Sequence, residues 1–383
     1  MSVLAAWLGW VLDAFDFTIY LLVIPSITRD FGVSMTAAAG SMTLTLLVRF
    51  LGGFAAGALG DRYGRKLPLM LSILWFAACD AAIFFAPSFA FVLLFRTLFG
   101  FGMGAEWTAG ATLAMENWPE RSRGIVSGVL QGSWAVGFAL AAVVTGYVEP
   151  RWGWRPLFLI AALPALLVIP IRLWVPESPE WKRARERKPV PLRDVLRTAN
   201  VLPRILWASS VLGAGFGTYY AVTGLYAPLV QNELGLTAST KSNLVLLFNA
   251  GFLVGAVVWG AYAARRGARR AIFVPAAASL LILPSYVGWA PGLAAAAFLA
   301  GALAVGHSGV TPLLLAQLFP PEIRARCIGL TYHLGALVAA VAPTVVAALH
   351  DGQGLRLSAA MLIVVFVCQG LLLVALVAIP RAA

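Results

Sequence analysis

The chain has 383 residues, of which 61% are hydrophobic and 11% charged, whereas an ordinary soluble domain has about 25% charged residues. Most of its surface must therefore face something other than water, which excludes a soluble globular protein. The net charge of +12 would suit nucleic-acid binding, but that function needs a basic face on a soluble domain. We expect an integral membrane protein with the lipid bilayer as its solvent and no nucleic acid as partner.

Apolar stretches of about 20 residues, long enough to cross ~30 Å of hydrocarbon as helices, follow one another along the chain. Turn signals such as Pro87 with Ser88 and Pro320 with Pro321 separate most of them. The fold class that this predicts is all-α and integral to a membrane, with twelve transmembrane helices. The expected spans are 4–28, 36–59, 67–86, 89–113, 123–147, 153–174, 204–230, 242–264, 271–289, 292–316, 327–349 and 356–379.

Lys and Arg gather in alternate loops. One set of loops and the C-terminal tail hold most of them, including the cluster from Arg172 to Arg204. The other set holds only Arg29, Arg151, Arg155, Lys241 and Arg356. The positive-inside rule then places both termini in the cytoplasm. The basic loops also suit anionic lipid headgroups.

The sequence repeats itself on the two sides of a charged linker. GALGDRYGRK, which starts at Gly57, reappears as GAYAARRGAR from Gly260, and WPERSRGIVSG from Trp118 matches FPPEIRARCIG from Phe319. Two pairs at nearly the same offset indicate a duplication, and parallel six-helix repeats are a recurring transporter plan. The predicted domains are an N-terminal bundle 1–175, a cytoplasmic linker 176–203 and a C-terminal bundle 204–383.

Acidic residues inside the first-half spans are candidates for carrying a proton, because a charge at mid-bilayer costs ~2.5–3.5 kcal/mol and needs a partner or a function. Asp13, Asp16 and Tyr20 share one helix face at i, i+3 and i+7. Asp16 and Glu106 are the leading candidates, with Asp13 behind them. A permanent ion pair of Asp16 with an arginine is the alternative.

Two intramembrane arginines complete the charged set. Arg49 presents the fixed fork that suits bidentate capture of a carboxylate, so it is expected either to bind a substrate anion or to release the proton on Asp16. Arg96 lies ten residues, and so ~15 Å, from Glu106 along one helix, and the two cannot be direct partners. Asp80 is expected in a solvated position near the outer mouth.

The second-half spans contain no acid or base of fixed charge. Their polar side chains can hydrogen-bond hydroxyl, amide or carboxylate oxygens. The expected substrate contacts among them are Tyr219, Tyr220, Asn249 and His333, with Tyr20 and Arg49 from the first half. An interhelical hydrogen bond is the alternative role for His333.

The first motif resembles a known family signature. GALGDRYGRK fits the major facilitator pattern G-x-x-x-D-R-x-G-R-K without a mismatch, and RTLFGFGMG from Arg96 is similar to the fourth-helix motif of that superfamily. The resemblance implies a coupling role for Arg96 and a bacterial inner-membrane location. It also implies a conformational latch, in which Asp61 faces a helix N-terminus. The residues of this latch are Gly57, Asp61, Arg62, Gly64, Arg65 and Lys66.

Within that superfamily, WLGWVLDAFDF from Trp7, ENWPERSRG from Glu116 and WGWRPLF from Trp152 resemble the sialate and monocarboxylate proton symporters. PESPEW from Pro176 is also similar to sugar porters and aromatic-acid symporters. The seventh span lacks the polar string of the lactate-transporting members, which argues against lactate. The fifth span lacks the Gly-Pro pair of drug exporters.

The predicted function is proton-coupled import of a small organic anion, such as a sialic acid or another carboxylate, by alternating access. A facilitator or exchanger for sugars or neutral metabolites is the alternative. No ATP-binding motif occurs, and scattered Cys and His residues give no metal spacing. We therefore expect no enzyme activity, no metal and no cofactor, with the proton gradient as energy source. A monomer is expected.

Overall fold

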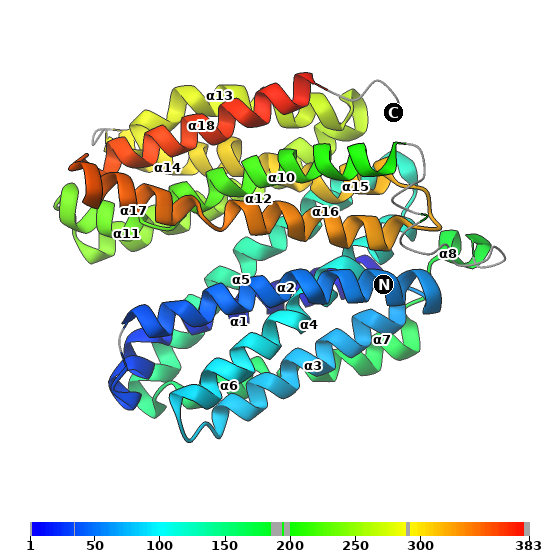
Figure 1. Cartoon of the computed structure of the whole chain (residues 1–383), viewed down its shortest axis with the longest axis horizontal. Helices are drawn as coiled ribbons and strands as arrows, with labels where there is room; N and C mark the ends of the chain where they lie inside the picture. The colour runs from blue at the N-terminus through cyan, green and yellow to red at the C-terminus, as the bar shows by residue number, and fades with distance from the viewer. Residues whose placement is uncertain (1, 34, 185–193, 195–199, 289–291, 379–383) are drawn as a thin grey trace. The chain divides into compact units, whose positions relative to one another are not determined.

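The computed structural model describes residues 2–33, 35–184, 194, 200–288 and 292–378, and the secondary structure in these ranges is helical throughout (Figure 1). The predicted linker falls partly outside them. The chain forms two compact units. The first unit comprises residues 1–118, 133–197 and 319–333, and the second comprises 119–132, 198–318 and 334–383.

Among the described residues, the first unit contains five long helices, α1 to α5, and several shorter ones. α4 packs against α2, α3 and α1, so it lies at the centre of the helices that carry the predicted charged residues (Figure 1). The elements are α1 Ser2–Phe31, α2 Met35–Tyr63, α3 Lys66–Phe84, α4 Phe89–Glu116, most of α5 Arg123–Trp152, α6 Arg155–Ala161, the 3₁₀ helix η2 Leu163–Leu167, α7 Val168–Trp174, α8 Pro179–Ala184 and the first part of α16 Arg324–Ala339.

The second unit places α12 against the α14–η6 segment, and α10 and α13 against α18. Its elements are η1 Glu120–Ser122, the start of α5, α10 Val201–Thr223, α11 Tyr226–Pro228, the π-helix η3 Leu229–Glu233, α12 Ala238–Arg266, α13 Ala268–Gly288, α14 Leu293–Ala300, the π-helix η5 Gly301–Val305, the 3₁₀ helix η6 Gly306–Val310, α15 Thr311–Leu318, the rest of α16, α17 Ala342–Gln353 and α18 Leu357–Val377.

Eleven helical segments among the described residues are long and apolar enough to cross a membrane. The expected sixth span, 153–174, is the exception, because it is divided into α6, η2 and α7 with Pro164 and Pro170 inside it. Proline lacks the amide proton that a continuous helix needs. The tenth expected span is also irregular, since η5 and η6 interrupt it.

Close glycine packing repeats in the two units. A Cβ added to Gly100 would lie 2.2 Å from the carbonyl oxygen of Thr45, and one added to Gly301 would lie 1.9 Å from that of Phe248. Gly301 follows Gly100, and Phe248 follows Thr45, at the same two sequence distances that separate the copies of the repeated motifs. α4 therefore packs on α2 as η5 packs on α12, and the glycines around Gly100 serve helix packing.

The repeated ten-residue motif ends a helix in both of its copies. Gly64 has φ +102° between α2 and α3, and Gly267 has φ +85° between α12 and α13. Positive φ is readily adopted only by glycine. Each copy therefore keeps a glycine where the chain turns from one span to the next.

The predicted domain boundaries stay a prediction, and the compact units follow them except at 119–132 and 319–333. Each of these segments begins a repeat-related helix that packs closely through small residues. A Cβ on Gly124 would lie 2.2 Å from the oxygen of Gly260, and one on Gly57 would lie 2.6 Å from Cα of Arg326.

Large apolar side chains cover much of the outer surface. Leu281 is 81% exposed, and Phe85 and Val143 are each 71% exposed. Exposed apolar surface of this extent is unfavourable in water and favourable in hydrocarbon. Together with the eleven spans, it makes the chain a multi-pass membrane protein.

Candidate functional site

Three polar residues of α1 lie on one buried face, as their spacing predicts. Asp13, Asp16 and Tyr20 are each 0% exposed. The Tyr20 hydroxyl forms a hydrogen bond of 2.5 Å with Ser41 Oγ of α2. α1 therefore directs two carboxyl groups into the interior of the first unit.

Arg96 of α4 is the ion-pair partner of the Asp16 carboxylate. Its Nη1 atom lies 3.1 Å from Asp16 Oδ1 and 3.8 Å from Asp80 Oδ1. The guanidinium also lies over the rings of Tyr20 and Phe99, at 4.5 and 4.3 Å from the ring centroids. Arg96 therefore interacts with carboxyl groups from two different helices, α1 and α3.

The expected position of Asp80 is wrong. Asp80 is 0% exposed on α3 and lies beside Arg96 rather than in a solvated outer mouth. This contact could not be predicted from the sequence, because Arg96 is 16 residues away on the next helix, outside any i+3 or i+4 relation. Only the packing of α3 on α4 brings the two residues together.

Arg49 of α2 occupies an aromatic setting. It is 5% exposed, and its guanidinium carbon lies 5.6 Å from the ring centroid of Trp10 and 5.8 Å from that of Tyr332. Its Nε and Nη2 atoms have no hydrogen-bond partner in the described structure. It interacts electrostatically with Asp13 and Glu106. A buried arginine with unused donors is equipped to receive an anion.

Glu106 of α4 lies against α1 at Gly9, a contact the sequence analysis did not identify. A Cβ added to Gly9 would lie 2.2 Å from Glu106 Oε1, so glycine leaves the space for this carboxyl group. Glu106 is 1% exposed, and its Oε2 has no hydrogen-bond partner among the described atoms. Glu106 interacts electrostatically with Asp13 and Arg49. Arg96 is not among its partners, in agreement with the distance between the two residues along α4.

His333 forms interhelical hydrogen bonds. Its Nε2 atom lies 3.3 Å from Thr108 Oγ1 and 3.1 Å from the carbonyl oxygen of Gly104. The neighbouring Tyr332 stacks on Trp107, with ring centroids 3.4 Å apart. α16 therefore adds an aromatic wall beside Arg49, and Tyr332 is a wall residue that the sequence analysis did not list as a contact.

A second charged cluster surrounds Arg65, between α2 and α3. Arg65 donates from Nε and Nη2 to the two oxygens of Glu116, each at 3.1 Å, and from Nη1 to Asp61 at 3.0 Å. Burial acts to lower the pKa of Arg65, but the Glu116 and Asp61 carboxylates outweigh it and raise that pKa. Arg324 Nη1 also contacts Glu116, at 3.2 Å.

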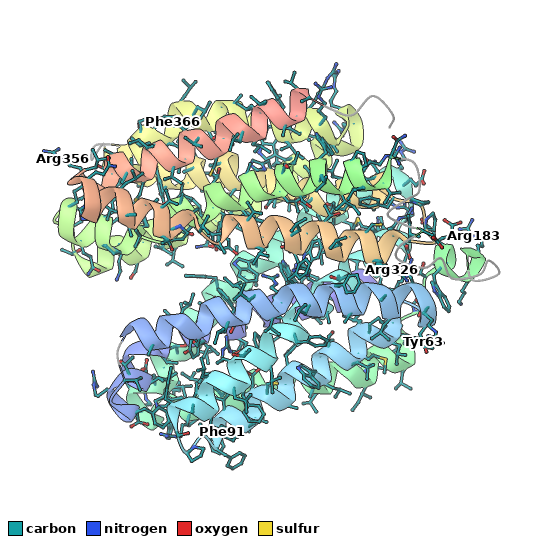
Figure 2. All side chains as sticks on the ribbon, viewed as in Figure 1. Tyr63, Phe91, Arg183, Arg326, Arg356 and Phe366 are labelled. Atoms are coloured by element: carbon teal, nitrogen blue, oxygen red, sulfur yellow. The ribbon has the colours of Figure 1, made fainter. Side chains whose placement is uncertain are left out.

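Asp61, a residue of α2 in this cluster, contacts the start of α16. Its Oδ2 accepts a hydrogen bond of 3.2 Å from the backbone amide of Arg326, in the first turn of α16. In Figure 2, Tyr63, Arg183 and Arg326 lie at the same end of the first unit. Arg62 lies over the ring of Tyr63 at 5.0 Å.

Glu177 links the PESPEW segment to the same cluster. Its carboxylate accepts hydrogen bonds from the backbone amides of Arg65 at 2.9 Å and Lys66 at 3.1 Å. These amides are at the positive end of α3. The sequence did not predict that this cluster includes Glu116, Glu177 and Arg324, because each of them is distant in sequence from Gly57–Lys66.

The predicted contacts of the second unit lie on α10 and α12. Tyr219 and Tyr220 are half-buried, with ring centroids 5.5 Å apart. Asn249 Nδ2 donates to the Val245 carbonyl at 2.9 Å. A stacked pair that the sequence did not reveal, Tyr226 and Tyr286, has ring centroids 4.3 Å apart.

Buried charges on spanning helices, together with duplicated helix packing, define the class of protein as a membrane transporter rather than an enzyme. The Major Facilitator Superfamily family model matches residues 6–237 and 211–383. The chain belongs to the Major Facilitator Superfamily.

Individual relatives agree with this assignment. The chain is 31% identical to the probable 4-methylmuconolactone transporter of Cupriavidus pinatubonensis, over 88% of this chain and 80% of that protein. It is 28% identical to the sialic acid transporter NanX of Escherichia coli, over 97% and 93%. The fold is similar to the human organic anion transporter MFSD10, with TM-score 0.77 and 18% identity, over 98% of both chains.

Proposed function

We propose that this protein is a proton-coupled symporter that imports a small organic anion by alternating access. The observation that carries the proposal is Arg49, a buried guanidinium between the rings of Trp10 and Tyr332. Among the described residues it forms no ion pair, and two of its donors have no hydrogen-bond partner. Transporters of 4-methylmuconolactone and of sialic acid among the relatives support an organic acid as substrate.

Arg49 is proposed to bind the substrate carboxylate. The carboxylate would accept hydrogen bonds from Nε and Nη2, the edge of the guanidinium that supports bidentate pairing. Its arrival competes with Asp13 and Glu106 for the same positive charge. Because an unpaired buried carboxylate is costly, these acids take up a proton when the anion binds.

Asp16 and Arg96 are proposed to couple proton binding to conformational change. Protonating Asp16 weakens its 3.1 Å ion pair with Arg96, which holds α1 to α4. Tyr20 lies beside this pair and contributes to the same site. Proton occupancy therefore acts directly on helix packing.

The remaining predicted residues are assigned to recognition and to the latch. Tyr219, Tyr220, Asn249 and His333 offer hydrogen-bonding groups for the substrate. In the cluster around Arg65, opening requires Asp61 to leave the Arg326 amide. The latch residues are Gly57, Asp61, Arg62, Gly64, Arg65 and Lys66.

The proton gradient is the proposed energy source, with no cofactor. We place the protein as a monomer in a bacterial inner membrane, with both termini in the cytoplasm. The basic residues at one set of loops support this orientation.

Uptake into proteoliposomes under an imposed pH gradient tests this function. The panel contains sialic acid, 4-methylmuconolactone, benzoate, lactate and glucose. We expect at least one acid to accumulate above its external concentration, and accumulation to collapse when a protonophore removes the gradient. Uptake of glucose alone, or acid uptake that never exceeds equilibrium, would contradict the proposal.

A further inference from the structure

Buried carboxyl groups outnumber buried guanidiniums inside the described spans of the first unit. Apart from Glu116, which belongs to the cluster around Arg65 at the end of α4, the acids are Asp13, Asp16, Asp80 and Glu106, and the two bases are Arg49 and Arg96. The excess of carboxyl groups is concentrated at Arg96, because one of its nitrogen atoms, Nη1, lies within 4 Å of both Asp16 and Asp80. Two ionised carboxylates and one guanidinium would leave a net negative charge in a buried site.

The two carboxyl groups are not equivalent. Asp16 Oδ1 accepts a hydrogen bond from Arg96, whereas Asp80 accepts none from Arg96 and its carboxyl group interacts with that of Asp16. A buried carboxylate without a hydrogen bond is strongly disfavoured. When two carboxyl groups share one site, one of them retains a proton.

We propose that Asp80, Asp16 and Arg96 form a triad that holds one proton, in which Arg96 pairs with either carboxylate while the other carries the proton. The proposal deepens the proposed symport function and rests on it. It gives Asp80 a role as a positioning residue and second proton acceptor.

The triad removes a difficulty that a simple ion pair would have. If Asp16 alone faced Arg96, protonating Asp16 would leave a buried guanidinium without its partner, which is strongly unfavourable. With Asp80 at 3.8 Å, Arg96 can exchange one carboxylate for the other through a small movement. The total charge of the triad is zero in both arrangements, and the proton that it releases on one side of the membrane in each transport cycle is replaced by a proton taken up from the other side.

The surroundings of Asp80 contain few other groups that titrate. α1 contributes Asp16, Asp13 and Tyr20, α4 contributes Arg96, and α3 itself contributes Cys79. α6, η2 and α7, which also pack on α3, contain two titratable residues, Arg155, which pairs with Asp30, and Arg172. On α2 the nearest such group to this cluster is Arg49, which interacts with Asp13. Among the described residues, Asp16 and Asp80 are the carboxyl groups within 4 Å of Arg96, so they are the immediate carriers of the proton on the triad.

The test compares Asp80→Asn with Asp16→Asn in proteoliposomes, using the panel acid that the wild-type protein accumulates most and a clamped membrane potential. Either change leaves a plain ion pair that holds no proton. Each variant should therefore lose one coupled proton, and its accumulation ratio should fall about tenfold for each unit of imposed pH gradient. Asp30→Asn, which alters an acid paired with Arg155 outside this cluster, should keep the wild-type ratio.

The outcomes separate the two proposals. Failure of the wild-type protein to accumulate any acid contradicts the symport function itself. Wild-type accumulation with an unchanged ratio and unchanged pH profile in Asp80→Asn overturns the triad and leaves symport standing. Restoration of the ratio in Asp80→Glu supports the triad, because that variant keeps the carboxyl group.

A spectroscopic measurement covers the case in which neutral variants do not fold. The infrared carbonyl stretch of a protonated carboxyl group should be present in the wild-type protein and should move in Asp80→Glu, since the proton then resides on a longer side chain for part of the time. A band that is absent, or that is the same in both proteins, overturns the triad.

Discussion

At the scale of single residues, the site depends on which buried charges have partners. Arg96 has carboxylate partners in Asp16 and Asp80, whereas Arg49 forms no ion pair among the described residues and lies between aromatic rings. An arginine that already has a carboxylate partner stabilises the fold, and one without such a partner is suited to bind an anionic ligand. This difference assigns the two arginines to different tasks.

Arg49→Lys should weaken substrate binding while preserving the positive charge. Lysine cannot reproduce the planar fork. Losing one charge-assisted hydrogen bond, worth about 1.5–3 kcal/mol, should raise the half-saturating acid concentration by about tenfold to a hundredfold. Initial rates of acid uptake across a concentration series measure this. Arg151→Lys, at an exposed contact with the Tyr147 carbonyl, is the matched control; equal effects of the two changes would argue against Arg49 as the anion site.

Glu106→Gln should uncouple uptake from the proton gradient at the Arg49 site. The amide keeps the shape of the side chain beside Gly9 but binds no proton. Accumulation should fall by about tenfold per unit of pH gradient, while exchange of internal for external acid persists. Glu120→Gln, an exposed carboxylate, should behave as wild type. Full accumulation in Glu106→Gln would assign the proton elsewhere.

At the scale of elements, glycines set how closely the helices approach. Gly100→Ala and Gly301→Ala each place a methyl group about 2 Å from a carbonyl oxygen of the neighbouring helix. Overpacking of this kind costs about 1–3 kcal/mol. The thermal unfolding midpoint in detergent should fall in both variants and not in Gly146→Ala, where the added atom meets nothing within 4 Å. A midpoint unchanged at Gly100 and Gly301 would refute the shared packing.

The end of α2 and the start of α16 form the proposed latch, and Cys327 is a native reporter of it. Cys327 is 1% exposed and follows Arg326, whose amide bonds to Asp61. Asp61→Asn weakens this contact and should raise the rate of maleimide labelling at Cys327 several-fold, in a background lacking Cys79 and Cys368. The same rate in Asp61→Asn and in the parent protein would dispose of the latch.

The sequence predicts elements better than contacts. Composition and span length identify the helices, because each must satisfy its own backbone in lipid. The broken sixth span and the irregular η5–η6 segment were not predicted, since an apolar run has the same composition whether its helix is regular or not. Asp80 with Arg96, and Glu116 with Arg65 and Arg324, depend on helix packing that no local pattern encodes.

At the scale of the whole molecule, the two repeats share features of their backbone and helix packing, but they do not share their charged residues. Gly64 and Gly267 end corresponding helices, and Gly100 and Gly301 make corresponding contacts. Asp61 has Ala264 at the matching position of the second motif, and the four intramembrane acids all lie in the first half. The fold therefore uses both repeats, while proton handling is assigned to one.

The central claim is that protons and an organic acid enter together. Its most direct test is a count of protons in weakly buffered proteoliposomes with no imposed gradient, using a panel acid that the wild-type protein takes up. Adding the acid outside should make the external medium more alkaline, in fixed proportion to the acid that enters, and Glu106→Gln should lower that proportion. Entry of the acid without any change in external pH would contradict the account.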